Sequence, residues 1–219
     1  MREKLALALD VPLSPYKLKE VSESVGVLKV SWPLTLALGI DRVRELAKSA
    51  DWVEVIADLK LADIYETMEK IVDKFDFADS FIAHSFVGVD GALGPLKEKL
   101  SREGKGLYLV LSMSHRGWDD SVFPSLLEVV RRVNPKGVVV GATKPSMVRR
   151  ARSELPGMVI ISPGVGAQGA RVGDAICNGA DVEIVGRAIY SSDDPVSSAR
   201  KVLDELRSRL LECQKGGNS

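Results

Sequence analysis

The stretch DWVEVIADLKLADIYET, residues 51–67, runs from an apolar segment through alternating charges into an amphipathic segment. Residues 52–58 are rich in valine and isoleucine, which predicts a buried β-strand. Residues 63–74 carry apolar side chains at helical spacing, which predicts an α-helix. The stretch is therefore one strand followed by one helix, with Asp58, Lys60 and Asp63 where the strand ends.

The same unit recurs along the whole chain of 219 residues. Strands are predicted over 4–10, 26–31, 52–58, 79–84, 107–112, 137–142, 157–162 and 181–185. Helices are predicted near 15–24, 36–49, 63–74, 89–101, 121–133, 145–154, 168–178 and 194–212. This alternation predicts a single α/β domain, a (β/α)8 TIM barrel over 1–213, with a frayed tail over 214–219. An open doubly wound sheet is the alternative architecture.

Composition narrows the classes of function. Thirty basic residues balance thirty acidic ones, and no long block of like charge occurs, so neither nucleic acid nor a membrane surface is an expected partner. The apolar run near the N-terminus is too short for a membrane span, and Asp10 interrupts it.

Cysteine and histidine usage gives two further expectations. Cys177 and Cys213 lie far apart on predicted helices, which argues against a disulfide and favours a reducing cytoplasm. The two histidines, His84 and His115, lack the spacing of a zinc site, so no metal site is expected.

Polar residues gather where the predicted strands end, which in a barrel is the mouth that carries the chemistry. Asp58 and Lys60 are two positions apart, so uninterrupted strand geometry places them on one face. Asp63 begins the sequence DIYE, which has the spacing of a helix-capping box, and capping and functional interpretations of this residue are both open. Charges at a core edge are costly to desolvate, which favours a functional role for the set.

A second pattern indicates a phosphorylated substrate. SPGVGAQG, residues 162–169, has glycines that let backbone N–H groups approach an anion ahead of a helix. VGRAIY, residues 185–190, adds Gly186 and Arg187 after the next strand, and arginine binds phosphate with paired hydrogen bonds. Loops after the seventh and eighth strands are the usual phosphate site of this fold.

Taken together, these motifs resemble the orotidine 5′-monophosphate (OMP) decarboxylase family. LALD, LKVSWPLTLALG, DLKLADI, MSHRG, SPGVGAQG and VGRAIY occur in the family's order and spacing over essentially the whole chain. The resemblance implies a cofactor-free (β/α)8 homodimer with shared active sites, which converts OMP to UMP and CO2 in pyrimidine biosynthesis.

The resemblance also implies roles for individual residues. Lys29, Asp58, Lys60 and Asp63 would form a charge network in which Lys60 donates the proton and Asp63 reaches the partner's site. The implied substrate-binding residues are Asp10, Lys29, Ile64, Thr67, Ser114, Ser162, Pro163, Gly164, Val165, Gly166, Gln168, Gly186 and Arg187. Thr67 and Ile64 would act from the neighbouring subunit, Ser114 at the pyrimidine, and Gln168, Gly186 and Arg187 at the phosphate.

Two alternatives stay open beside this resemblance. One is a metal-dependent sugar-phosphate decarboxylase or synthase of the same superfamily, and the other is an inactive barrel that only binds a phosphate ligand. Four residues depart from the family pattern: Ser31, Ser85, Arg116 and Ala170. They affect the expected shape of the pyrimidine loop and leave the charged residues in place.

Overall fold

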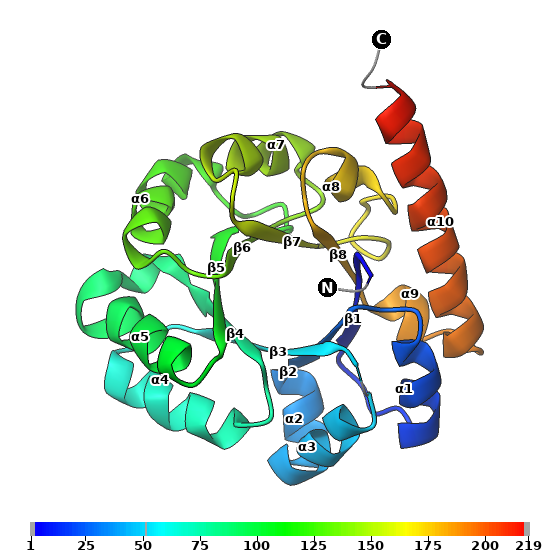
Figure 1. Cartoon of the computed structure of the whole chain (residues 1–219), viewed down its shortest axis with the longest axis horizontal. Helices are drawn as coiled ribbons and strands as arrows, with labels where there is room; N and C mark the ends of the chain where they lie inside the picture. Colours follow the sequence, from blue (N-terminus) through cyan, green and yellow to red (C-terminus); the bar gives the residue numbers. More distant parts are fainter. Residues whose placement is uncertain (1–2, 51, 217–219) are drawn as a thin grey trace.

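The computed structural model describes residues 3–50 and 52–216. Eight parallel strands pair in chain order, and β8 pairs with β1 to close a barrel (Figure 1). The strands are β1 Leu5–Leu9, β2 Val27–Ser31, β3 Glu54–Leu61, β4 Ser80–His84, β5 Gly106–Ser112, β6 Gly137–Val140, β7 Val159–Pro163 and β8 Val182–Val185. The predicted (β/α)8 barrel is confirmed, and the open sheet is wrong because no strand edge between β1 and β8 is left unpaired.

Helices surround the barrel on its outer face (Figure 1). They are α1 Pro15–Ser22, α2 Trp32–Leu38, α3 Ile40–Lys48, α4 Tyr65–Val72, α5 Gly94–Arg102, α6 Phe123–Val133, α7 Pro145–Glu154, α8 Asp174–Cys177, α9 Arg187–Tyr190 and α10 Pro195–Gly216. Short 3-10 turns occupy Asp73–Phe75, Ser85–Val87 and Asp120–Val122.

Four predicted helices differ from the observed ones. The helix expected over 89–101 begins only at Gly94, as α5, because Asp90 and Gly91 have non-helical backbone angles. The helix expected near 36–49 is two helices, because Gly39 takes a φ of 77° between α2 and α3. The helix expected over 168–178 is only α8, because the preceding residues form a glycine-rich loop. The last helix begins at Pro195 and runs to Gly216, four residues beyond the predicted end at 212, while 217–219 of the predicted tail lie outside the described residues.

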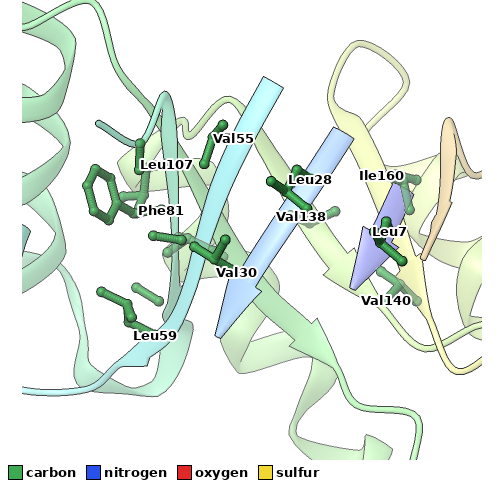
Figure 2. Packing of buried hydrophobic residues seen from close by; sticks show 14 of the residues in the cluster. Leu7, Leu28, Val30, Val55, Leu59, Phe81, Leu107, Val138, Val140 and Ile160 are labelled. Atoms are coloured by element: carbon green, nitrogen blue, oxygen red, sulfur yellow. The ribbon is translucent and has the colours of Figure 1, made fainter. Parts of the chain in front are cut away.

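The core has two layers because strand side chains alternate between opposite faces. One layer fills the barrel and consists of small and branched residues around Tyr108, such as Ala6, Val27 and Ile161. The other lies between strands and helices and includes Leu7, Leu28 and Phe81 (Figure 2). Packing on both faces fixes the strand ends, and therefore the mouth of the barrel.

A disulfide joins Cys177, at the end of α8, to Cys213 near the end of α10. The sequence expectation of no disulfide is wrong, because the fold brings the two Cα atoms to 5.8 Å although 36 positions separate them in the chain. That Cα separation is within the range that a disulfide requires. The bond holds the last turns of α10 against the barrel.

Reduction of this disulfide is expected to lower the free energy of unfolding by about 4 kcal/mol, because the bond closes a long loop in the unfolded chain. Denaturant unfolding with and without a reductant measures the difference. Cys213→Ser, which cannot form the bond, is the control and should not respond to the reductant. Titration of two free thiols in the unreduced, unfolded protein would contradict the disulfide.

Candidate active site

A cavity of about 260 Å³ opens at the carboxyl ends of the strands. It is lined by Ala8, Asp10, Lys29, Asp58, Lys60, Met113, Ser114, Pro163, Gly164, Val165, Ala167, Gln168, Ile184, Gly186, Arg187 and Tyr190. Most of the residues singled out from the sequence therefore meet in one place, although they come from six different strands or the loops after them. The sequence signals did not single out Ala8, Met113, Ala167, Ile184 or Tyr190 as site residues.

Lys29, Asp58 and Lys60 form a charged triad at the floor of this cavity. The Lys29 Nζ lies 2.9 Å from Asp58 Oδ2, and the Lys60 ammonium donates a hydrogen bond to Asp58 Oδ1. Burial by itself would raise the pKa of Asp58, but the charges and hydrogen bonds of the two lysines outweigh it and lower that pKa to about 2. Asp58 is therefore ionised at neutral pH.

The backbone of β3 is irregular at Lys60. Its register against β4 shifts between Ala57 and Leu61, and Lys60 has a φ of 46°, in the left-handed region that non-glycine residues rarely adopt. A bulge of this kind changes the direction of a side chain. Asp58 and Lys60 do face the same cavity, as predicted, but through a bulge and not through the uninterrupted alternation from which the prediction was made.

The side chain of Asp10 is held between two hydroxyl groups. Ser31 Oγ donates to Asp10 Oδ1 at 2.6 Å, and the Tyr190 hydroxyl donates to Oδ2 at 3.3 Å. Burial is the main cause that raises the pKa of Tyr190, and the neighbouring Asp10 carboxylate adds to it. Ser31, one of the departures from the family pattern, thus has a defined role in orienting Asp10.

The segment SPGVGAQG, here called the glycine loop, forms one wall of the cavity. Gly164, Gly166 and Gly169 have φ values of 109°, 75° and 103°, which explains the choice of glycine. The loop closes on itself, since Gly166 N–H donates to the Ala170 carbonyl at 2.8 Å. Arg187 is the first residue of α9 and is exposed, so its guanidinium and the backbone N–H groups of the glycine loop share one end of the cavity.

The loop that carries Ser114 is fixed by β6 and the turn after it. Thr143 Oγ1 donates to the Ser114 carbonyl at 2.6 Å, and Lys144 Nζ donates to Asp120 Oδ2 at 2.7 Å. Ser112 Oγ donates to the other oxygen of Asp120 at 2.6 Å. These contacts hold Ser114 at the side of the cavity.

Five predicted residues do not line the cavity. Ser162 is buried with its side chain outside the barrel, and Gly166 lies on the outer part of the glycine loop. Asp63 and Ile64 are exposed beside the mouth, while Thr67 lines a separate apolar hollow with Trp32 and Phe75. Within a single chain these five residues do not surround the triad.

The capping-box interpretation of Asp63 is wrong. Ile64 occupies the cap position of α4, and no side chain caps the helix. Among the residues that the structure describes, the Asp63 carboxylate accepts a hydrogen bond only from the adjacent Ile64 N–H, at 2.7 Å. The backbone enters the helix one residue later than a capping box on Asp63 requires.

The other departures from the family pattern are accommodated locally. Ser85 is buried and its hydroxyl donates to the Val110 carbonyl at 2.6 Å. Ala170 contributes its carbonyl to the closure of the glycine loop, and Arg116 lies at an exposed hollow next to Ser114. None of these contacts involves the charged triad.

Among residues 3–50 and 52–216, no three His, Cys, Asp or Glu side chains are arranged to hold a metal ion. Over the same residues, no helix combines the length and the apolar character that crossing a membrane requires.

The chain is similar to proteins of one family over nearly its full length. Residues 3–202 match the profile described as "Orotidine 5'-phosphate decarboxylase / HUMPS family". A relative named orotidine 5'-phosphate decarboxylase, from Sulfurisphaera tokodaii, is 49% identical over 215 residues, which cover 98% of this chain and 99% of the relative.

Solved structures show the same likeness. The orotidine 5'-monophosphate decarboxylase of Sulfolobus solfataricus superimposes with a TM-score of 0.93 at 44% identity, covering 95% of this chain and 100% of that one. The enzyme of the same name from Methanocaldococcus jannaschii, complexed with the inhibitor BMP, has a TM-score of 0.84 at 34% identity, covering 93% and 98%.

Proposed function

Because this chain belongs to the orotidine 5'-phosphate decarboxylase / HUMPS family, we propose that it is a carboxy-lyase that converts OMP to UMP and CO2 without a cofactor. The observation that carries the proposal is the charged triad at the floor of the cavity, next to the glycine loop and Arg187. The charged triad can act on a reacting carbon while the glycine loop and Arg187 hold a phosphate.

The chemistry requires a nearby acid. When the bond between C6 of the pyrimidine and the carboxylate breaks, the electron pair stays on C6, and the ring offers no good electron sink. The Lys60 ammonium stabilises this developing negative charge and transfers a proton to C6, after which it regains a proton from solvent. Asp58 accepts a hydrogen bond from Lys60 and so holds it in place, and its own negative charge would crowd the substrate carboxylate.

The remaining residues bind the parts of the nucleotide that do not react. Asp10 and Lys29 bind the ribose hydroxyls, and Ser114 binds the pyrimidine. Arg187 and Gln168 hold the phosphate together with Gly186 and the glycine loop, which closes over it. Binding energy from the phosphate can be used in the transition state if closure also excludes water from the triad.

We propose that the protein is a homodimer and that each subunit contributes residues to the active site of its partner. Asp63 and Ile64 are exposed beside the mouth, although they lie only three and four positions beyond Lys60. Large apolar side chains are also exposed near this rim, with Ile64 at 58% and Phe86 at 62% of their full accessibility. A second copy packed there would bring Asp63, Ile64 and Thr67 to its partner's cavity.

We place the protein in the cytoplasm, as an enzyme of pyrimidine biosynthesis. The disulfide removes the argument from cysteine usage on which that location was first predicted. A disulfide is compatible with that location, since intracellular proteins of hyperthermophiles carry such bonds.

The test of the reaction is to incubate purified, chelator-treated protein with OMP and to identify the products by chromatography. UMP and CO2 are expected in equal amounts, and the rate should be unchanged by the chelator, because Lys60 takes the electrophilic role. The rival sugar-phosphate activity predicts the reverse, a rate that the chelator abolishes and Mg²⁺ restores. An inactive barrel would bind UMP and form no product.

A further inference from the structure

Glu183, in the middle of β8, is a buried carboxylate that the reaction does not use. None of its surface is accessible to solvent. Its neighbours Val182 and Ile184 belong to the layer that fills the barrel, so the Glu183 side chain points to the opposite, helix-covered face. There it lies under the segment that links the glycine loop to α8.

Three backbone N–H groups converge on this carboxylate. Gly173 N–H donates to Oε2 at 2.8 Å, and the N–H groups of Ala175 and Ile176 donate to Oε1 at 2.8 and 3.2 Å. Burial is the main cause that raises the pKa of Glu183, and the three hydrogen bonds oppose that rise. Burying a carboxylate without hydrogen-bond partners costs free energy of folding. The three N–H groups offset this cost for Glu183.

These contacts fix one end of the glycine loop. The loop is closed by hydrogen bonds between Gly166 and Ala170 and between Ala170 and Gly164. Only two residues, Arg171 and Val172, separate Ala170 from Gly173, whose N–H donates to the Glu183 carboxylate. The other end of the loop continues β7, whose Ser162 is paired in register with Glu183 itself.

The backbone angles and the lack of space at position 173 both require glycine. Its φ is 87°, and a Cβ there would lie 2.2 Å from the side chain of Arg209 on α10. The backbone is therefore enclosed between Glu183 on the inside and α10 on the outside. Gly173 precedes α8 directly, and the disulfide between Cys177 and Cys213 joins α8 to α10.

We propose that Glu183 is a positioning residue of the phosphate site. Through Gly173 it fixes the position of the glycine loop relative to β8. Gly186 and Arg187 follow directly after β8 and form the opposite side of that site. One strand thus sets the distance between the two groups that hold the phosphate. This inference rests on the proposed function, because it takes the ligand of the loop to be a nucleotide phosphate.

Glu183→Gln tests the proposal because it keeps the size of the side chain and replaces one acceptor oxygen with a donor. At least one of the three N–H groups then lacks an acceptor, and the link between loop and strand is weakened. The affinities of the wild type and the variant for UMP and for uridine are measured by titration calorimetry. The preference for UMP over uridine is expected to fall about tenfold, the effect of one hydrogen bond to a charged group, while uridine binding stays the same.

Asp181→Asn is the matched control. Asp181 lies just before β8 at the opposite end of the barrel, where its carboxylate accepts a hydrogen bond from Ile160 N–H at 2.8 Å and pairs with Arg152. Asp181→Asn is expected to lower stability without changing the preference for UMP. A purely structural role of Glu183 would give the same pattern in Glu183→Gln.

The outcomes separate the inference from the proposed function. A wild type that binds UMP no better than uridine overturns the proposed function. A wild type that prefers UMP, with an equal preference in Glu183→Gln, overturns the inference alone. If Glu183→Gln does not fold, the same measurement on Glu183→Asp, which withdraws the carboxylate but keeps its charge, decides the question in the same way.

Discussion

Lys60→Ala is expected to reduce turnover of OMP by at least about 10⁴-fold, because it removes both the proton donor and the positive charge next to the carbanion. Affinity for UMP should fall much less, by about tenfold at most, since the lysine matters most as the negative charge develops on C6. Steady-state kinetics and UMP titration on the same preparation give both numbers. Asp58 keeps Lys29 as a partner at 2.9 Å, so the variant is expected to fold.

Lys99→Ala is a suitable control for this experiment. Lys99 also pairs with carboxylates, Asp73 at 2.8 Å and Glu103, but it lies on α5 at the outer surface. Its replacement should leave turnover within about twofold, as for other surface substitutions. Equal losses of turnover and of UMP affinity in Lys60→Ala would contradict the role of Lys60 as the acid.

Asp63→Asn is expected to reduce turnover about 10²-fold or more and to leave stability almost unchanged. The substitution removes a charge that the proposed dimer places next to the partner's Lys60, while asparagine keeps the shape and can still accept the hydrogen bond from Ile64 N–H. Because Asp63 is exposed and caps no helix, the free energy of unfolding should change by less than about 0.5 kcal/mol. Glu66→Gln, in the first turn of the same helix, is the control for a general effect of charge and should be nearly silent.

Mixing the two inactive variants tests whether the site is shared. A mixed dimer of Lys60→Ala and Asp63→Asn subunits has one site with both lesions and one site with neither. Random exchange makes about half of the dimers mixed, so about a quarter of the wild-type activity should return. If exchange is demonstrated by mass spectrometry and no activity returns, Asp63 acts within its own subunit and the shared-site dimer is wrong.

The barrel was predictable from the sequence because each strand carries its own signal. Apolar runs such as the one before Asp58, followed by segments of helical spacing, define the units without knowledge of their packing. The residues at the ends of those runs then had to meet at one mouth. For this reason Asp58, Lys60 and Arg187 could be named from the motifs themselves, while Asp10, Lys29 and Ser114 were named from the family resemblance.

What the sequence did not predict depends on contacts between distant segments or on irregular backbone. The disulfide needs α8 and α10 side by side, and nothing local to Cys177 or Cys213 indicates that. The bulge at Lys60 could not be predicted, because the sequence around it has the pattern of a regular strand. The role of Glu183 has no sequence signal, since its partners are the backbone N–H groups of Gly173 and of α8.

The most direct test of the account is the initial rate at which the wild-type protein removes the ultraviolet absorbance of OMP, with the substrate in large excess. We expect many turnovers per site, at a rate that is the same before and after chelation, with UMP as the product. No loss of absorbance above the buffer control, from protein that is folded and binds UMP, would contradict the claim that the charged triad of Lys29, Asp58 and Lys60 is a working decarboxylase site.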